Sequence, residues 1–416
     1  MNKQLVILLL LEFCMHGSLA QKKKTAMDSL AMEVDYNNKT LTMQAKYFYY
    51  PKTNRTDSVY FSLNPAFTVT EITAPGLKSR AFKPRKDRPF PFHLLRFDKP
   101  FDGKVVPIQF NYVIELGKLA PNEFEWIEMM VDQLWFPNAT DLDNSFVSHV
   151  LVRGLPSDYS LYSYQPFKEK SDHSYVIDER GQNVPEITFL AGKDMTLKKI
   201  DTGGISISYF MPGNVTDSTL NSINKKMIDI INYYNGSFGR TKPVKKFVIA
   251  LRRVPRKIMG SQTTREGFVI TGVDFNTNLG NYAHEFGHFW FTGADFIRDS
   301  WLNESFANFA MMRALRKFDP EQAERSYNIF KKKAETPGPV SPAGAFDGGT
   351  SYDRYYSKGC YLLLQLEEQI GSERMDKLLA LRIKKKINTT AGVMQALETV
   401  TNRLIRQDFE KKIMGN

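Results

Sequence analysis

The 416-residue chain has few cysteines and few long apolar runs. Its two cysteines are Cys14 and Cys360, and Cys14 lies in a leader that we expect to be removed, so no disulfide within the mature chain is expected. This excludes a small scaffold that depends on disulfides. Beyond residue 20, no run approaches the roughly twenty apolar residues of a membrane-spanning helix, so no transmembrane span is expected. An apolar content of 42% and an aromatic content of 13% exclude a disordered chain.

The first twenty residues have the pattern of a secretory signal peptide. Lys3 precedes an apolar run over residues 5–11, Glu12 follows it, and Ser-Leu-Ala ends at Ala20. We expect cleavage after Ala20 and a mature protein that is secreted, periplasmic or held in the cell envelope. Export without disulfides favours a bacterial envelope over animal secretion.

Basic residues outnumber acidic ones, and the formal net charge is +11. The lysine runs at 22–24, 331–333 and 384–386 are scattered and have no aromatic residues between them. A solvated surface is therefore favoured, and no nucleic-acid partner is expected. Weak attraction to anionic surface polymers stays open.

The pattern of apolar residues divides the chain into two parts. From residue 33 to about 210, short alternating runs are separated by turn residues, as at 40–49, 105–113 and 205–210. After residue 211 a helical period takes over, beginning with Asp217 and Ser218 as caps of a helix to Tyr234. We expect an α+β protein. Its expected parts are a signal peptide (1–20), an antiparallel β-rich domain (21–210) and a domain of strands and helices (211–416).

The segment His284-Glu285-Phe-Gly-His288 places two histidines four residues apart. On a helix, both imidazoles can then reach one point, with Glu285 beside it. In the HExxH arrangement, two histidines bind zinc and the glutamate is the general base of a metalloprotease. The alternative is a chance occurrence on a solvated helix.

Glu304 is the expected third metal ligand. A catalytic zinc ion takes three protein ligands and keeps one position for water. Residues 301–310 are largely apolar, so a glutamate among them is costly unless it is paired or binds a metal. A surface glutamate at the edge of an amphipathic helix is the alternative. Asn308, one turn further on, could orient His284.

These residues together resemble the zinc aminopeptidases related to aminopeptidase N and leukotriene hydrolase. That family follows HExxH with Trp-Leu-Asn-Glu-Gly-Phe-Ala, which residues 301–307 match except that Ser305 replaces glycine. It then carries Tyr-x-Lys-Gly, matched at 356–359. The resemblance implies a thermolysin-like α/β catalytic domain, one Zn²⁺ ion, peptide substrates and a catalytic role for Tyr356. The alternative for Tyr356 is a packing role.

The chain departs from this family at three places. Fifteen residues separate His288 from Glu304, three fewer than usual. The family motif Gly-x-Met-Glu-Asn, whose glutamate binds the free amino terminus of the substrate, is missing; its glutamate falls on Thr264, with Glu266 two residues further on. The large carboxy-terminal helical domain is not expected, which implies a more open cleft. Peptide hydrolysis is therefore predicted, but aminopeptidase and endopeptidase stay open.

Two further segments and one rival function complete the predictions. Residues 337–349 are rich in proline and glycine and are predicted to form a rim or lid of the site. An acidic cluster before Trp135 is interpreted as an exposed loop, with replacement of the amine-binding glutamate as the alternative. Its members are Glu123, Glu125, Glu128 and Asp132. The rival function is a non-catalytic, zinc-containing peptide-binding protein of the cell envelope.

Overall fold

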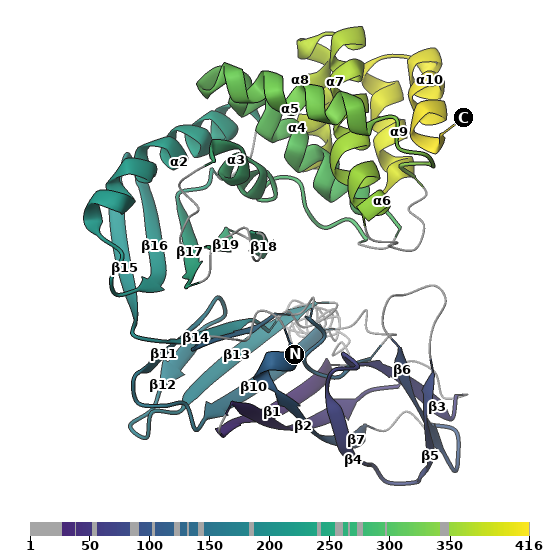
Figure 1. Cartoon of the computed structure of the whole chain (residues 1–416). Helices are drawn as coiled ribbons and strands as arrows, with labels where there is room; N and C mark the ends of the chain where they lie inside the picture. The colour runs from purple at the N-terminus through teal and green to yellow at the C-terminus, as the bar shows by residue number, and fades with distance from the viewer. Residues whose placement is uncertain are drawn as a thin grey trace, which may run out of the picture.

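The computed structural model describes most of the chain after residue 26. The described residues are 27–37, 39–51, 56–83, 91–101, 105–119, 125–130, 133–139, 145–182, 187–238, 243–253, 261–264, 267–272, 278–295, 298–341 and 349–415. The predicted signal peptide lies outside them. Within these ranges no helix has the length and apolar character needed to cross a membrane. Figure 1 shows a strand-rich half, formed by the earlier part of the chain, below a helix-rich half.

Alternating apolar residues build the strand-rich half. Strand β2 (Thr40–Tyr49) buries every second side chain, as its sequence period predicts. It lies in a seven-stranded sheet of order β12-β13-β10-β1-β2-β7-β4, in which β1 and β10 are parallel and the other neighbours antiparallel. The other strands are β1 (Met27–Asn37), β4 (Thr68–Thr73), β7 (Val106–Glu115), β10 (Ser145–Arg153), β12 (Phe167–Glu169) and β13 (Tyr175–Gln182).

Two smaller antiparallel sheets complete this half. The first has the order β5-β6-β3-β9 and the second the order β11-β14-β8. Both share one apolar core with the large sheet, in which Phe61 and Trp135 are fully buried. The elements are β3 (Ser58–Ser62), β5 (Leu77–Lys83), β6 (Phe92–Phe97), the 3-10 helix η1 (Leu116–Lys118), β8 (Trp126–Met129), β9 (Asn138–Ala139), β11 (Tyr159–Ser163) and β14 (Phe189–Lys193).

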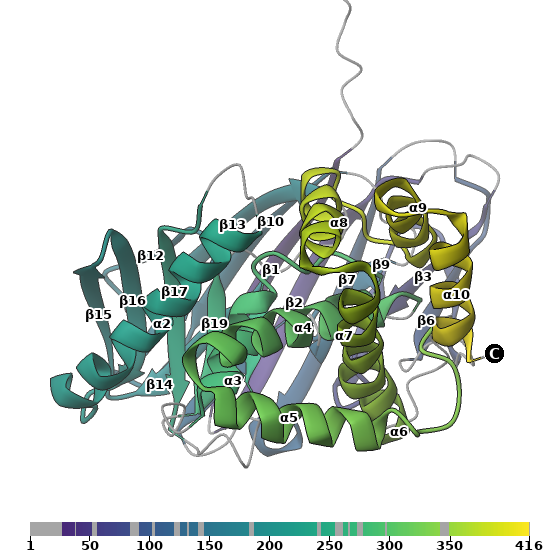
Figure 2. The ribbon, with the colours of Figure 1, turned by 90° about the horizontal axis from the view of Figure 1, so that it is seen from above.

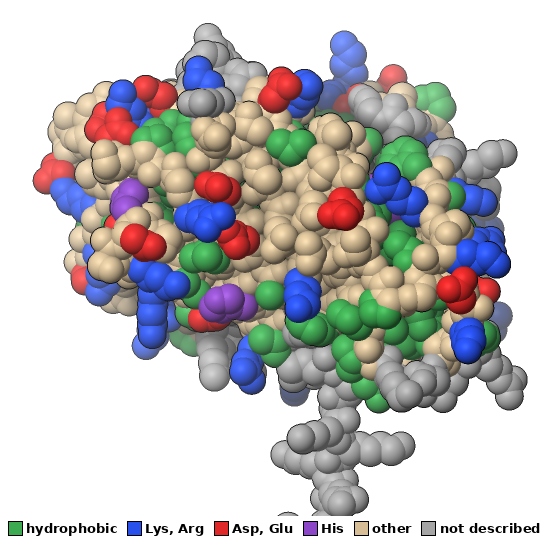
Figure 3. Space-filling model, turned by 90° about the horizontal axis from the view of Figure 1, so that it is seen from below, with side chains coloured by type: hydrophobic (Ala, Val, Ile, Leu, Met, Phe, Trp, Pro, Cys, Tyr) green, Lys and Arg blue, Asp and Glu red, His purple; other side chains and the backbone are tan. Residues whose placement is uncertain are grey.

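On the face of the molecule seen in Figure 3, basic and acidic side chains are interspersed, not gathered by sign. Charged neighbours within the large sheet pair with one another: Arg153 of β10 forms ion pairs with Glu33 and Asp35 of β1. The face drawn there thus shows no single basic patch among the described residues, despite the positive net charge.

A five-stranded sheet of order β15-β16-β17-β19-β18 underlies the helix-rich half. Strands β16, β17 and β19 are parallel, and β15 and β18 are antiparallel edge strands. The strands are β15 (Met195–Thr202), β16 (Ile205–Pro212), β17 (Lys246–Arg252), β18 (Gln262–Thr264) and β19 (Phe268–Gly272). Helices and mainly antiparallel sheets in one chain agree with the α+β prediction. Strand β15 lies before residue 210 and β16 runs across it, yet both belong to this sheet. The predicted division of the chain at residue 210 stays a prediction.

Helices α2 (Asp217–Ser237) and α3 (Leu279–Gly287) cover one face of this sheet (Figure 1). Helix α2, which begins after the cap Thr216, lies across the strands in Figure 2 and buries Ile223 and Ile230 against them. The remaining helices are α4 (Ser300–Phe318), α5 (Pro320–Lys333), α6 (Gly349–Tyr352), the π-helix η4 (Asp353–Lys358), α7 (Gly359–Ile370), α8 (Ser372–Lys384), α9 (Thr390–Val400) and α10 (Arg403–Met414). Helix α4 is central, because most of its side chains are buried.

The other face of the five-stranded sheet packs on the strand-rich half. Trp126 and Leu190 lie in one apolar cluster with Phe210 and Phe268, and the Tyr164 ring stacks on Phe268. Alternation along β19 sends Val269 to the helices and Phe268 to this junction. The junction is therefore a packed apolar interface.

A buried ion pair crosses this junction, and it corrects a prediction. Arg252 of β17 binds both carboxylate oxygens of Glu128 of β8, at 2.7 and 2.8 Å, and the Trp126 indole donates to the same carboxylate at 2.9 Å. The prediction of an exposed acidic loop is wrong for Glu128, which is fully buried, because a cation from the other half neutralises it. Glu125 is exposed and pairs with Lys193. Glu123 and Asp132 lie outside the described residues.

Candidate active site

Helix α3 carries the two histidines of the HExxH segment. The helix begins after Asn278, whose side chain accepts a hydrogen bond from Gly280, and ends at Gly287. His288 follows directly in a helical conformation, so the four-residue spacing keeps both rings on one side. The Nε2 atoms of His284 and His288 are 3.2 Å apart, and the ring planes are nearly perpendicular. Both imidazoles therefore converge on one point.

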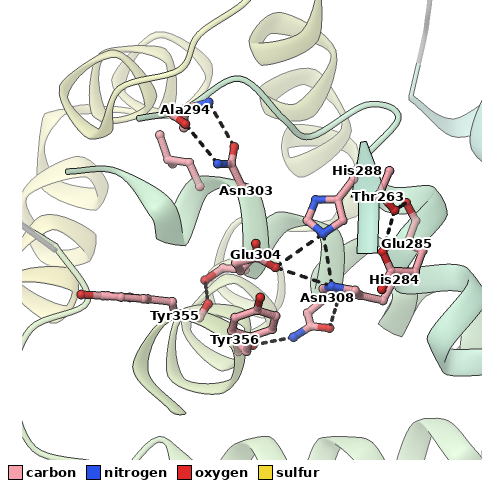
Figure 4. A network of polar contacts seen from close by, with 12 residues as sticks. Thr263, His284, Glu285, His288, Ala294, Asn303, Glu304, Asn308, Tyr355 and Tyr356 are labelled. Carbon is pink, nitrogen blue, oxygen red and sulfur yellow. Dashed lines mark hydrogen bonds and ion pairs between the residues drawn. The ribbon is translucent and has the colours of Figure 1, made fainter. Parts of the chain in front are cut away.

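Close packing of α3 against α4 brings in the carboxylate. A Cβ atom on Gly287 would lie only 2.9 Å from the Cα of Ala307, so the two backbones meet where both residues are small. Glu304 stands one turn before Ala307 on α4. Its Oε2 lies 3.5 Å from the Nε2 atoms of both His284 and His288 (Figure 4). The structure thus brings together the three predicted metal ligands.

The shortened connector between His288 and Glu304 does not prevent this convergence. Asn303 fastens the connector to the start of α4, since its side chain both accepts from the Ala294 N–H and donates to the Ala294 carbonyl, each at 3.1 Å. Asp299 accepts hydrogen bonds from the backbone and hydroxyl of Thr390 at the start of α9. The connector is therefore tied at both ends to helices.

The three side chains form a buried group of compensating charges. Burial alone would lower the pKa of His288, but the Glu304 carboxylate outweighs this and raises that pKa to about 9. Burial alone would raise the pKa of Glu304, but the two histidines hold it well below its usual range. A positively charged partner is therefore favoured beside Glu304.

The geometry of this group fits a tetrahedral metal ion. Ligand atoms about 2.0–2.2 Å from such an ion lie roughly 3.3–3.6 Å apart, close to the separations of 3.2, 3.5 and 3.5 Å between these atoms. Glu304 Oε2 is buried and has no hydrogen-bond partner among the described residues, which is costly unless something else binds it. Two imidazole nitrogens and a carboxylate oxygen are ligands that zinc accepts. These three residues are the group that could hold a metal among the described residues.

Asn308 of α4 links the metal group to the predicted catalytic tyrosine. Its Oδ1 lies 2.8 Å from Nδ1 of His284, and its Nδ2 donates to the Tyr356 carbonyl at 2.8 Å. When Nδ1 of His284 donates to Asn308, Nε2 is left to bind a metal. The predicted contact between Asn308 and His284 is confirmed. The second contact, to Tyr356, was not predicted.

A π-helical turn presents Tyr356. The π-helix η4 interrupts the regular hydrogen bonding between α6 and α7. Ser305 donates to the Tyr355 carbonyl at 2.5 Å, and Asn308 donates to the next carbonyl, so α4 side chains satisfy both. A Cβ atom on Gly359 would lie 2.0 Å from Ser305 Oγ, so only glycine fits there. Ser305, where the resembled family has glycine, thus helps to hold η4.

The Tyr356 ring is stacked between two aromatic rings. It lies 5.7 Å from the His284 ring and 4.0 Å from the Tyr352 ring, centroid to centroid. Burial, together with the nearby Glu304 carboxylate, raises the Tyr356 pKa well above its usual value. The hydroxyl therefore stays protonated and can donate a hydrogen bond.

Glu285 lies beside the metal group and touches a residue that the sequence did not single out. It is buried on α3, and the Thr263 hydroxyl of β18 is 2.6 Å from its Oε2. No sequence signal pointed to Thr263, because β18 is three residues long and belongs to no matched motif. Thr264 pairs with Phe268 in the sheet. Glu266 and residues 342–348 of the predicted lid lie outside the described residues.

No protein-family model matches the chain, and no curated protein matches it by sequence. Among solved structures, it is similar to the M1 zinc metallopeptidase from Deinococcus radiodurans, with 13% identity, a TM-score of 0.65, and 94% of this chain and 93% of that chain covered. It has the fold of these metallopeptidases. A mutant of that enzyme bound to a Tyr-Ser-Ala substrate gives a TM-score of 0.66 at 13% identity, covering 94% of each chain. A mutant of a two-domain M1 zinc metallopeptidase bound to L-tryptophan gives 0.64, with the same identity and coverage.

Proposed function

We propose that the protein is a zinc-dependent metallopeptidase that hydrolyses peptide bonds. The observation that carries this proposal is the convergence of His284, His288 and Glu304 around a buried carboxylate oxygen to which no described residue donates a hydrogen bond. One Zn²⁺ ion would be held by these three side chains. The shared fold and the peptide substrate of the neighbouring enzyme support it. A catalytic unit over residues 211–416 and export by a signal peptide belong to the same proposal.

Each side chain of the site has a role in this proposal. When bound, zinc lowers the pKa of water to about 7 and polarises the substrate carbonyl. Glu285 takes the proton from the attacking water and passes it to the leaving amine. The Tyr356 hydroxyl donates a hydrogen bond to the oxyanion that the carbonyl oxygen becomes when water attacks the carbonyl carbon. Asn308 orients His284.

The choice between exopeptidase and endopeptidase depends on how the substrate amino terminus is bound. Glu128 is one of the four acids that could replace the missing amine-binding glutamate, but its carboxylate is already paired with Arg252. This pairing argues against Glu128 as the amine-binding residue and leaves aminopeptidase and endopeptidase action open. Peptides of one sequence with free and with acetylated amino termini test this. Equal cleavage of both supports endopeptidase action, and cleavage of the free form alone supports an aminopeptidase.

The experiment that tests the function compares wild type with Glu285→Gln on a mixture of fluorogenic peptides. Glu285→Gln removes the general base but none of the three metal ligands, so we expect a loss of turnover of at least roughly two powers of ten with unchanged zinc content. Glu373→Gln is the matched control, because Glu373 is exposed on α8 and pairs only with the neighbouring Lys377 among the described contacts.

Two results would contradict the proposal. Equal activity of wild type and Glu285→Gln would exclude Glu285 as the base. Stoichiometric zinc with no hydrolysis by wild type would instead favour the rival function, a zinc-containing peptide-binding protein.

A further inference from the structure

Strand β18 runs beside α3 and sends one side chain to the proposed general base. Thr263 is the central residue of β18, and its backbone pairs with Val269 of β19. Its Oγ1 lies 2.6 Å from Oε2 of Glu285 and 3.0 Å from the Glu285 carbonyl oxygen (Figure 4). Thr263 lies outside the three matched sequence motifs, yet it contacts Glu285 of the HExxH motif.

The chemistry of the two groups decides which hydrogen bond forms. A hydroxyl has one proton to donate, whereas an ionised carboxylate can only accept. The shorter distance and the negative charge both favour donation from Thr263 to Oε2 of Glu285. Since Glu285 is buried, water competes little for this oxygen. The hydrogen bond therefore fixes one end of the carboxylate.

The fixed carboxylate lies on the metal side of α3. Its negative charge acts on both His288 and Tyr356, so the carboxylate lies near both groups. A glutamate side chain has several rotatable bonds, and an unrestrained one would occupy several rotamers. Holding Oε2 leaves the second oxygen as the acceptor for a proton from water.

We propose that Thr263 is a positioning residue for the proposed peptide hydrolysis, whose hydroxyl holds one oxygen of Glu285 so that the other faces the attacking water. This inference rests on the proposed function. It assigns a role in hydrolysis to the edge strand of the five-stranded sheet, through a side chain in the stretch where the Gly-x-Met-Glu-Asn motif of the resembled family is missing.

Thr263→Val isolates the hydroxyl. Valine is β-branched, has nearly the same shape as threonine and favours strands, so β18 and its packing should persist while the hydrogen bond is lost. Thr263→Ser keeps the hydroxyl and removes only the methyl group. Thr271→Val is the matched control on β19, because Thr271 is buried and its hydroxyl contacts Ser261, 2.7 Å away.

The experiment measures kcat, KM, zinc content and melting temperature of these three variants on one fluorogenic peptide. A hydrogen bond to a charged group predicts a roughly 10- to 100-fold fall in kcat for Thr263→Val, with KM changed by less than about twofold and zinc retained. Thr263→Ser should restore most of the rate. Thr271→Val should leave kcat near that of wild type.

Several results would overturn the inference. Wild-type kcat in Thr263→Val would show that the hydroxyl does not act on the base. Loss of zinc or a lower melting temperature in Thr263→Val, or an equal loss of rate in Thr271→Val, would assign a structural role. An inactive wild type would overturn the proposed function and this inference with it, whereas an active wild type with an unimpaired Thr263→Val overturns the inference alone.

Discussion

Two buried groups of charged side chains, one at the junction of the halves and one between α3 and α4, differ in how completely they satisfy each other. Glu128 and Arg252 have no exposed side-chain surface, and both carboxylate oxygens receive hydrogen bonds. Glu304 is almost as buried, but within the described part of the chain its Oε2 has only ion-pair distances of 3.5 Å to His284 and His288. In the Glu128–Arg252 pair both carboxylate oxygens accept hydrogen bonds, whereas Oε2 of Glu304 accepts none from the described residues.

The difference indicates what each group is for. A buried ion pair with full hydrogen bonding is self-sufficient, and removing one partner leaves an uncompensated charge. A buried carboxylate oxygen without a donor is instead expected where a ligand binds. The junction pair should therefore govern stability, and the group between α3 and α4 should govern metal binding and hydrolysis.

Glu304→Gln should have the largest effect on the site. Glutamine keeps the volume of the side chain but removes the charge that balances a metal ion. We expect loss of stoichiometric zinc and a fall of peptide hydrolysis to background, measured by elemental analysis and turnover. Glu128→Gln is the control and should retain zinc. Full zinc content and activity in Glu304→Gln would show that the group between α3 and α4 does not govern metal binding and hydrolysis.

Glu128→Gln should have the largest effect on stability. It leaves Arg252 buried without an anionic partner, so the free energy of unfolding should fall by about 3–5 kcal/mol in denaturant titrations. Glu128→Leu combined with Arg252→Met should recover much of this loss, because neither charge then remains buried. A loss below about 1 kcal/mol in the single variant would show that the pair is not a stability element.

Tyr356→Phe should reduce turnover by roughly two to three powers of ten, because one oxyanion donor is removed. The ring itself remains, so stacking on His284 and zinc content should persist. Steady-state kinetics on a fluorogenic peptide checks this. Tyr361→Phe is the control, since its hydroxyl contacts Gln365 on α7. Equal rates in Tyr356→Phe and wild type would show that Tyr356 has a packing role and no catalytic role.

Asn308→Ala should weaken zinc binding about 10- to 100-fold, because His284 loses the acceptor that orients it. Competition with a chelator of known affinity measures the change. Unchanged affinity would show that packing alone orients the imidazole.

For each pH unit, the pH dependence of zinc binding should be the smallest of these effects. The raised pKa of His288 means that the metal-free protein holds a proton there below about pH 9, and zinc must displace it. Apparent zinc affinity should therefore fall by up to about tenfold per pH unit below pH 9. In the metal-free protein, the stability from His288 is complete below about pH 6.5 and is lost as the pH rises to about 9. Zinc titrations between about pH 7 and 9 that show no change would contradict this.

Local sequence spacing predicted the elements that carry the site. The HExxH spacing placed His284 and His288 on one side of a helix, and apolar periodicity predicted α2, β2 and β16 at nearly their observed bounds. The proximity of Glu304 to the histidines could not be derived from spacing alone. It depends on the backbone contact of Gly287 with Ala307, and the expectation came from the apolar surroundings of Glu304 and from the resemblance to a family.

Contacts between distant residues left no local signal. Glu128 and Arg252 are 124 positions apart, and the acidic cluster around Glu128 reads as an exposed loop. Thr263 could not be found either, because its role depends on where β18 lies relative to α3. The parallel pairing of β1 with β10 could not be predicted from the sequence either, because an alternating apolar pattern fits both parallel and antiparallel neighbours.

X-ray absorption at the zinc edge tests the central claim most directly. With one zinc ion per chain, we predict a first shell that contains two imidazole nitrogens and oxygen ligands at about 2.0–2.2 Å, and the loss of that shell in Glu304→Gln. Absence of zinc from the purified protein, or a zinc shell without imidazole, would contradict the account.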